Sequence, residues 1–180
     1  MNGILKSWLP LVVITTAFAA LAYVSVQQAY RQSADDPQIQ MAEDTAAALE
    51  AGRPVDEVLP AETIDIAHSL APFYVVFAET GEPVAATGSL NGEMPRLPDG
   101  VLAYARENGQ HRLTWQPAGD TRIATVIVPS RDGFVLAGRN LREVEAREEQ
   151  VSRFAVLAWL LSTIGTFVVI GLCQVIFKEA

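Results

Sequence analysis

HRLTWQPAGDTRIATVIVPSRDGFVLAGRN, residues 111–140, is the part of the sequence with the clearest strand pattern. It holds three stretches rich in β-branched and apolar residues, at 111–116, 121–129 and 134–140. The sequences between them, PAGD and SRDG, combine proline, glycine and aspartate, which favour tight turns. Strands joined by such short turns pair antiparallel. Residues 111–140 therefore predict a three-stranded meander.

A second hairpin is predicted upstream of the meander. Apolar residues at 73–78 form one strand, and the turn sequence ETGE leads to a return strand at 83–87. The next stretch, 88–100, is rich in glycine and proline, which indicates irregular structure. A short helix then follows, introduced by PDG at 98–100 and ending near Gly109. Hairpin and meander together predict a five-stranded antiparallel sheet in an α+β fold.

Helical patterns flank the predicted sheet. Asp36-Pro37 matches an N-cap and a first-turn proline, and Gly52 matches the glycine that often follows a helix, so residues 37–51 are predicted to form a long helix. Its apolar residues recur at helical spacing and give one buried stripe. A second short helical piece is expected over 61–70, and a charged helix over 141–152 leads out of the sheet.

Two long apolar runs without charges lie near the ends of the chain. Each reaches the roughly 20 residues that a helix needs to cross ~30 Å of hydrocarbon. Aromatic residues near their ends, such as Trp8 and Tyr23, suit the headgroup region. The expected parts are an N-terminus at 1–7, a first transmembrane helix at 8–29, a domain at 30–153, a second transmembrane helix at 154–177 and a C-terminus at 178–180.

The N-terminus indicates the orientation of the domain. Lys6, an apolar stretch and the small-residue sequences AFA and ALA at 17–22 resemble a secretory signal. The helical pattern continues past Ala22, so we expect the segment to remain as an anchor. Arginines close to the spans argue for the opposite orientation, but long loops translocate largely regardless of charge. The domain is therefore expected outside the bacterial inner membrane, with both termini cytoplasmic.

The segment between the two runs is acidic. It holds all but one of the 21 aspartates and glutamates, whereas the only lysines, Lys6 and Lys178, lie outside it. The net charge of the chain is −8. An acidic surface repels a phosphate backbone, which argues against a nucleic-acid partner.

The sequence contains no motif for catalysis or metal binding. A nucleophile elbow, a phosphate-binding glycine loop and metal-ligand spacing are all missing. The only cysteine, Cys173, lies in the second apolar run, and His68 and His111 are far apart in the sequence. We therefore expect no enzyme activity, no catalytic residues, no metal and no cofactor.

The order of these elements resembles the extracytoplasmic PAS-like (Cache-type) sensor domains of bacterial two-span membrane receptors. The resemblance rests on the helix that continues from the first span and on the strand 134–140, which passes through LREVE at 141–145 into the second span. It implies a PAS-like sheet, with a ligand between the sheet and the crossover segment. We expect no cytoplasmic output domain after the second span, so a signal is expected to pass through a membrane partner or a homodimer.

Strand register suggests one binding site. If the two turns occupy 117–120 and 130–133, Trp115 faces Arg122 and Ala124 faces Arg139. Two arginines beside an indole then form a pocket for a small acidic ligand, with Tyr74 of the 73–78 strand as a fourth candidate. The alternative is structural: Arg122 stacks on Trp115, and Arg139 bonds a carboxylate. The opposite face, which carries Ile123, Ile127, Phe134 and Leu136, is expected to pack on the long helix.

Two functions remain open at this point. The first is a membrane-anchored extracytoplasmic module that senses or binds a ligand and acts through a membrane partner or a homodimer. The second is a non-sensing accessory or assembly subunit of a larger bacterial membrane complex. A pocket with converging polar groups under the crossover favours the first function, and a sealed core favours the second.

Overall fold

The computed structural model describes residues 2–119 and 121–176, without the side chains of residues 2, 31–35 and 118. The chain divides into two compact units: a helical unit formed by residues up to Tyr30 and from Ala146 onward, and a unit of residues 31–145, here called the domain. Asp120 in the first expected turn, the last residue of the second expected span and the expected cytoplasmic C-terminus lie outside the described residues.

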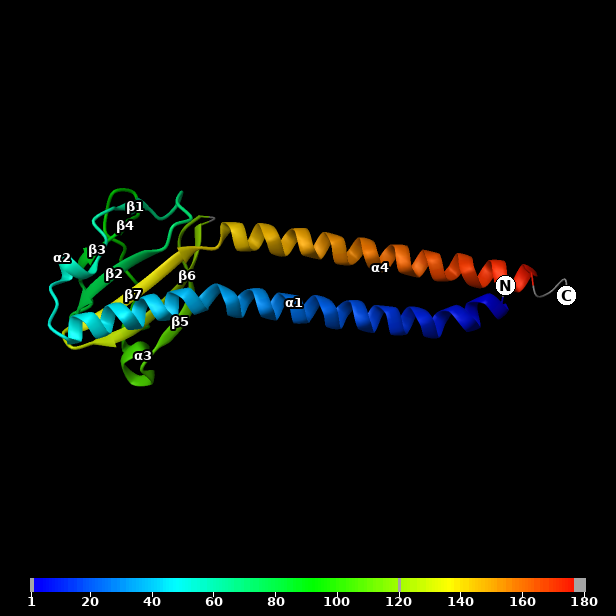
Figure 1. The fold of residues 1–180 in the computed structure, drawn as a ribbon, viewed down its shortest axis with the longest axis horizontal. Coiled ribbons are helices and arrows are strands. Elements are labelled where there is room, and N and C mark those ends of the chain that lie inside the picture. The colour runs from blue at the N-terminus through cyan, green and yellow to red at the C-terminus, as the bar shows by residue number, and fades with distance from the viewer. Residues whose placement is uncertain (1, 120, 177–180) are drawn as a thin grey trace. The chain divides into compact units, whose positions relative to one another are not determined.

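The fold is α+β, with a long N-terminal helix and a five-stranded antiparallel sheet, as expected (Figure 1). The elements are α1 (Asn2–Glu50), α2 (Val55–Val58), β1 (Ile64–Asp65), β2 (Phe73–Ala78), β3 (Pro83–Ala86), β4 (Gly88–Ser89), α3 (Val101–Asn108), β5 (His111–Ala118), β6 (Thr121–Ser130), β7 (Gly133–Asn140) and α4 (Arg142–Ile176).

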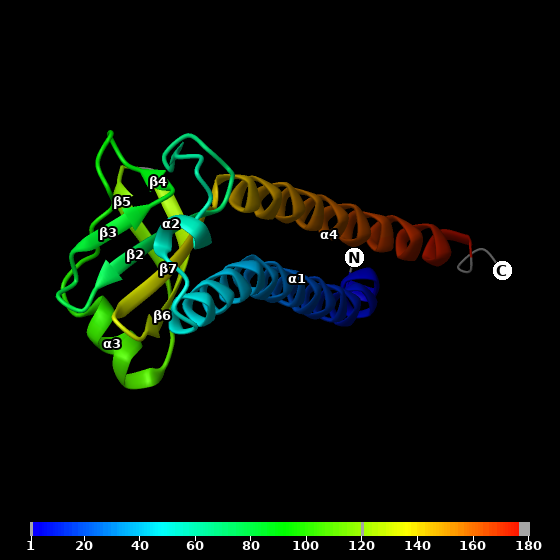
Figure 2. The same ribbon diagram turned by 60° about the vertical axis from the view of Figure 1, so that its left-hand side comes forward.

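The sheet has the strand order β3-β2-β7-β6-β5, so the hairpin and the meander join through the pairing of β2 with β7 (Figure 2). The five expected strands are confirmed to within two residues at each end. The helix expected over 61–70 is wrong. This stretch contains β1, which pairs in parallel with β4, and the Ile64 N–H donates to the Thr87 carbonyl at 2.8 Å. Long-range strand pairing therefore overrides the local helical pattern.

The register of the meander is correct at one turn and wrong at the other. Pro129 pairs with Phe134 and Ala124 with Arg139, as expected. Trp115 pairs with Ile123 instead of Arg122, because the register shifts between Trp115 and Ala118. Two residues of β5 oppose one residue of β6 there, which is a β-bulge. One of the two is Pro117, which has no N–H to donate to the ladder.

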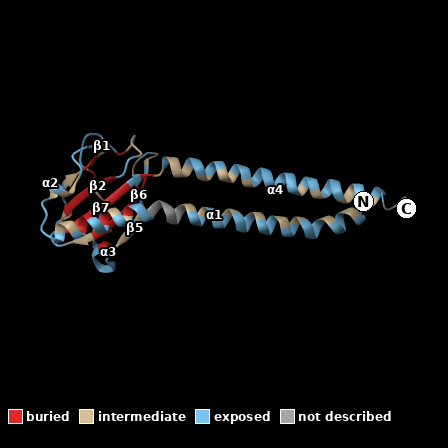
Figure 3. Cartoon of the chain, in the orientation of Figure 1, coloured by how far each residue is buried: buried red, intermediate tan, exposed pale blue. Residues whose placement is uncertain are grey.

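Both faces of the sheet are covered by apolar packing. The central strands are accordingly buried (Figure 3). One face, here called the crossover face, packs against the segments between β1 and α3. Its buried residues are Ile66, Phe73, Val75, Phe77, Ala105, Trp115, Ile123, Ile127, Phe134 and Leu136.

The other face, here called the helix face, packs against α1. Ala42 and Ala46 of α1 join the buried residues Val126, Val128, Val135 and Ala137. The expectation that the long helix covers the face of Ile123 and Phe134 is therefore wrong. Small alanine side chains let α1 approach the β-branched residues of the helix face closely, and the larger aromatic residues lie on the crossover face.

Helix α1 includes Pro37, so the helix start expected at Asp36-Pro37 is wrong. Proline removes one backbone hydrogen bond from a helix interior, and the buried side chains that follow, such as Ala42, hold the helix on the sheet. The expected helix end is confirmed. Gly52 has φ +82°, its N–H donates to Leu49 O at 2.9 Å, and Arg53 N–H donates to Ala48 O at 3.2 Å. This is a Schellman motif.

The helical unit contains two helices long and apolar enough to cross a membrane. The apolar stretches lie in Gly3–Tyr30 and in α4, and their mean hydropathies are 2.1 and 2.2. Two indoles join the helices within this unit: Trp8 Nε1 donates to Thr163 O at 3.1 Å, and Trp159 Nε1 donates to Thr16 Oγ1 at 2.9 Å. The two spans are compatible with a membrane protein.

Candidate functional site

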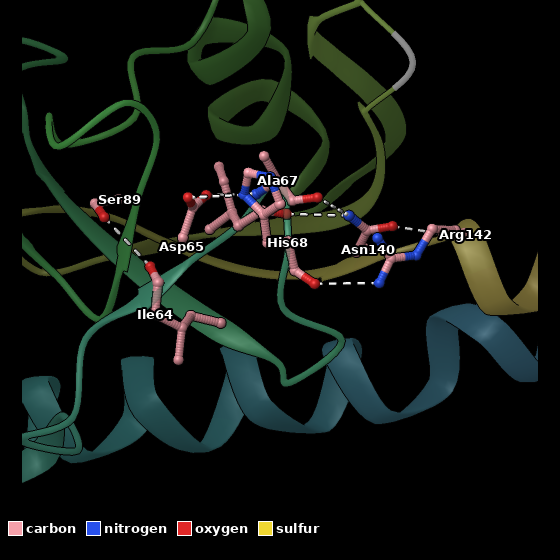
Figure 4. Close-up of polar contacts among 8 residues, drawn as sticks. Ile64, Asp65, Ala67, His68, Ser89, Asn140 and Arg142 are labelled. Atoms are coloured by element: carbon pink, nitrogen blue, oxygen red, sulfur yellow. Dashed lines mark hydrogen bonds and ion pairs between the residues drawn. The ribbon is translucent and has the colours of Figure 1, made fainter.

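The candidate site lies where residues 64–70 meet the end of β7 and the first turn of α4, here called the junction (Figure 4). Asn140 is 5% exposed and occupies its centre. Its Nδ2 donates to Ile66 O at 3.0 Å and to Ala67 O at 3.4 Å, while its Oδ1 accepts the N–H of Arg142 at 2.9 Å. One side chain therefore satisfies two carbonyls of the segment and one free N–H at the start of α4.

Two arginines extend the junction on either side of Asn140. Arg142 donates from a terminal nitrogen to His68 O at 3.1 Å, and Arg139 Nε donates to Leu70 O at 3.2 Å. Both acceptors are backbone carbonyls of the 64–70 segment. The segment is therefore held by donors from β7 and from α4 at once.

A further contact joins β6 to the first turn of α4. Arg122 forms an ion pair with Glu145, and the N–H of Leu141 donates to the Arg122 carbonyl at 2.8 Å. Both charged side chains are partly exposed, so the ion pair itself contributes at most about 1 kcal/mol. The backbone bond fixes the position at which α4 begins.

Asp65 stabilises the turn that brings the segment to Asn140. Its Oδ1 accepts the N–H of Ala67 at 2.9 Å, and its Oδ2 lies 2.9 Å from His68 Nδ1. These hydrogen bonds, first that of His68 and then that of Ala67, hold the pKa of the Asp65 carboxyl below its ordinary value of 3.8.

The Asp65 carboxyl gives a prediction for pH dependence. A carboxyl whose pKa is lower in the folded state contributes stability above its unfolded pKa, and loses it as the pH falls through the folded value. We therefore expect Asp65 to titrate below pH 3.8 in the folded protein and nearer to 3.8 in His68→Ala, because the largest cause of the shift is removed. Carboxyl ¹³C resonances followed against pH measure both values. An unchanged midpoint in His68→Ala would contradict the assignment.

The structure separates the four residues expected at the binding site. Arg122 and Arg139 share the helix face, as expected, because Ala124 opposite Arg139 lies two residues from Arg122. Trp115 lies on the crossover face and is 6% exposed, so the expected cluster of an indole with two arginines is wrong. The register shift in β5 is the physical cause.

The partners of these candidates come from other elements. Arg122 bonds Glu145, Arg139 bonds the Leu70 carbonyl, and Trp115 lines an open hollow of about 500 Å³ beside the 90–98 segment. Tyr74 packs on the helix face beside the α1 residues, and burial, followed by the charge of Asp44, raises the pKa of its hydroxyl. The two arginines thus belong to the junction, while the Trp115 and Tyr74 side chains form no described hydrogen bond or ion pair with it.

The sequence interpretation missed Asn140 and Asp65. Asn140 directly precedes the charged helix, and asparagine at that position is a common capping residue, so a signal was present. No comparable signal marked Asp65, and its segment was expected to form a helix instead of a turn. Among the described residues, no three histidine, cysteine or acidic side chains gather as a metal site.

No protein-family model, no curated protein and no solved structure matches the chain.

Proposed function

We propose that the chain is a membrane-anchored sensing module with a PAS-like domain outside the bacterial inner membrane, and that it acts through a membrane partner or its own dimer. The observation that carries this proposal is the junction. Helix α4 contains both the first turn that Asn140 caps and an apolar window long enough to span a bilayer. A change in the 64–70 segment therefore acts on a helix that also includes the second span.

The crossover segment supplies a route to the junction. Ser89 Oγ donates to Ile64 O at 3.4 Å, and Ile66 N–H donates to Ser89 O at 3.0 Å, so hydrogen bonds join β4 to β1. β4 leads directly into residues 90–98, which line the hollow beside Trp115. Occupation of that hollow would alter β4, then the 64–70 segment, and then the bonds made by Asn140 and Arg142. Such a chain of packed and hydrogen-bonded contacts is the physical basis of coupling between sites.

The strand order supports the PAS-like part of the proposal. Taken in chain order, β2, β3, β5, β6 and β7 are the first to fifth strands, and they lie across the sheet in the order 2-1-5-4-3. The long crossover falls between the second and third strands, and a helix precedes the first. This order supports the proposal of a PAS-like sheet, although a shared fold alone assigns no function.

An accessory or assembly subunit is the second candidate function. It is favoured by the packing of the crossover face, where Phe73 is 1% exposed and fills the space beside Gly88 and Gly138. A face filled in this way needs no ligand to complete it. The domain would then contribute through its surface contacts with other exported proteins.

The orientation of the domain is tested by cysteine labelling. In a Cys173→Ser chain, we expect single cysteines at the exposed Thr80 and Arg112 to react with a membrane-impermeant maleimide in intact spheroplasts. Thr80 is preferable to Gly81, whose φ of +88° would strain a cysteine. A cysteine at Lys6 is the matched control and should react only after lysis. The reverse labelling pattern would place the domain in the cytoplasm.

The proposed coupling from the hollow beside Trp115 through the 64–70 segment to α4 is here called the relay. It is tested with Cys173, which is exposed on α4. Oxidative or bismaleimide cross-linking of full-length protein in membranes should capture a second copy or a partner, and Cys173→Ala should abolish the product. We expect Asn140→Ala to change the yield about twofold or more, since coupling between sites is worth roughly 0.5–2 kcal/mol. Asn108→Ala is the control, because Asn108 bonds only the Tyr104 carbonyl of its own helix. An equal yield in wild type and Asn140→Ala would contradict the relay and favour the assembly subunit.

A further inference from the structure

A hollow of about 400 Å³ lies where α1 ends, beside the turn between β6 and β7. Its apolar lining comes from Leu49 of α1, Val76 of β2 and Val84 of β3. Two arginines, Arg53 and Arg131, also line it. It lies away from the junction and from the hollow beside Trp115, with which it shares no lining residue.

The two arginines differ from the other arginines of the domain. Six arginines have a hydrogen-bonding or ionic partner: Arg96, Arg106, Arg112, Arg122, Arg139 and Arg142. Of the domain arginines whose side chains the structure describes, only Arg53 and Arg131 form no described ion pair or side-chain hydrogen bond. Both line the same hollow. Both are exposed, and in an acidic chain with net charge −8 two positive charges at one hollow attract an anion.

Rigid backbone carries both arginines. Arg53 is part of the Schellman motif, and its N–H is bonded to Ala48 O. Arg131 lies in a two-residue turn closed by the pairing of Ser130 with Gly133. A Cβ at Gly133 would lie 1.9 Å from the Phe77 carbonyl oxygen, so this turn is held tightly against β2. Fixed backbone lowers the entropy cost of placing the two guanidiniums around a ligand.

The apolar lining restricts the chemistry of the anion. Val76 is buried, while Val84 is 62% exposed and presents a β-branched side chain at the hollow. A purely polar anion would leave the Val84 side chain in water. Guanidinium groups match the geometry of a carboxylate. From this combination we infer that the hollow binds a small organic anion with a carboxylate on a short apolar body.

Asp132 is the one acidic residue of the lining. It adjoins Arg131 in the turn and is exposed, so it opposes a bound anion through like charge. Asp132 should therefore lower the affinity for an anion, and it forms no described ion pair with Arg53 or Arg131. Replacing Asp132 should raise the affinity, whereas replacing either arginine should lower it. The site does not depend on the relay, because none of its residues lies in the junction.

The test uses full-length protein with ¹⁵N-arginine in nanodiscs of zwitterionic lipid. Sodium hexanoate is titrated against sodium chloride of equal ionic strength, and the arginine Nε–H resonances are followed. We expect saturable shifts at Arg53 and Arg131 but none at Arg112, which is exposed and bonded to Gln110 elsewhere on the domain. Arg53→Gln and Arg131→Gln should each weaken binding about three- to tenfold, the range of one charge-assisted contact. Asp132→Asn should strengthen it.

A neutral ligand tests the contribution of the two arginines to binding, and a short ligand tests the contribution of the apolar lining. Hexan-1-ol should bind more weakly than hexanoate, and acetate should bind more weakly than hexanoate in the wild type. Val84→Asn should reduce the difference in affinity between hexanoate and acetate. Equal binding of hexanol and hexanoate, unchanged affinity in both arginine variants, or equal shifts at Arg112 would each overturn the inference. Asn140→Ala should still bind hexanoate, so failure of the relay would be seen separately from failure of this site.

Discussion

Replacement of Asn140 with alanine is expected to lower the free energy of unfolding of the domain by about 2–4 kcal/mol, because it leaves buried backbone groups without partners. The carbonyls of Ile66 and Ala67 lose their donor, and the N–H of Arg142 loses its acceptor. Asn140 is almost fully buried, so water cannot easily replace these bonds. The variant therefore combines the loss of a helix cap with the loss of a contact between distant segments.

Urea unfolding in detergent measures this effect, followed by the fluorescence of Trp115 in a full chain whose Trp8 and Trp159 are replaced with phenylalanine. Hydrogen exchange of the amides at 66–70 and 141–146 shows where it acts, and both groups should exchange faster in Asn140→Ala. Asn108→Ala is the matched control: Asn108 is exposed and bonds a single carbonyl, so we expect a loss of about 1 kcal/mol or less. A loss in Asn140→Ala no larger than in the control would contradict the central place of Asn140 in the junction.

The strands could be predicted from sequence because each is bounded by a local signal. Turn sequences at 79–82 and 130–133 set the hairpins, and the second of these also gave the correct register. The 117–120 turn did not, since a bulge at Gln116 and Pro117 depends on how the whole strand fits its neighbour. One extra residue was enough to move Trp115 to the other face.

The junction could be predicted only in part, for a similar reason. The sequence placed Arg122 and Arg139 on one face, and that face is correct. Their partners, Glu145 and the Leu70 carbonyl, come from a helix and from a loop far away in the sequence. The 64–70 segment adopts its structure through bonds to β4, which local periodicity cannot report. Tertiary hydrogen bonds therefore determine what these arginines do.

The aromatic ring of Phe73 is expected to give the largest single stability effect. Phe73→Ala should lower the free energy of unfolding by about 3–5 kcal/mol, the usual cost of removing a buried phenyl ring. The ring lies between two glycines: a Cβ at Gly138 would come within 2.6 Å of its Cζ, and a Cβ at Gly88 within 2.8 Å of its Cδ2. Urea unfolding of the full chain measures the effect, and a loss under about 1.5 kcal/mol would mean that the ring is loosely packed.

A double-mutant cycle with Gly138 decides whether the crossover face is as full as this packing implies. Gly138→Ala alone should cost about 1–3 kcal/mol, because the new methyl group meets a fully buried ring. In the Phe73→Ala background the same methyl group enters empty space, so its cost should fall close to zero and the two effects should not add. Additive effects would show that Phe73 can move aside, and a face with such freedom could admit a ligand. Strong coupling between the two substitutions would show that the crossover face has no room for a ligand. The domain would then act through a surface site or through contact with another protein.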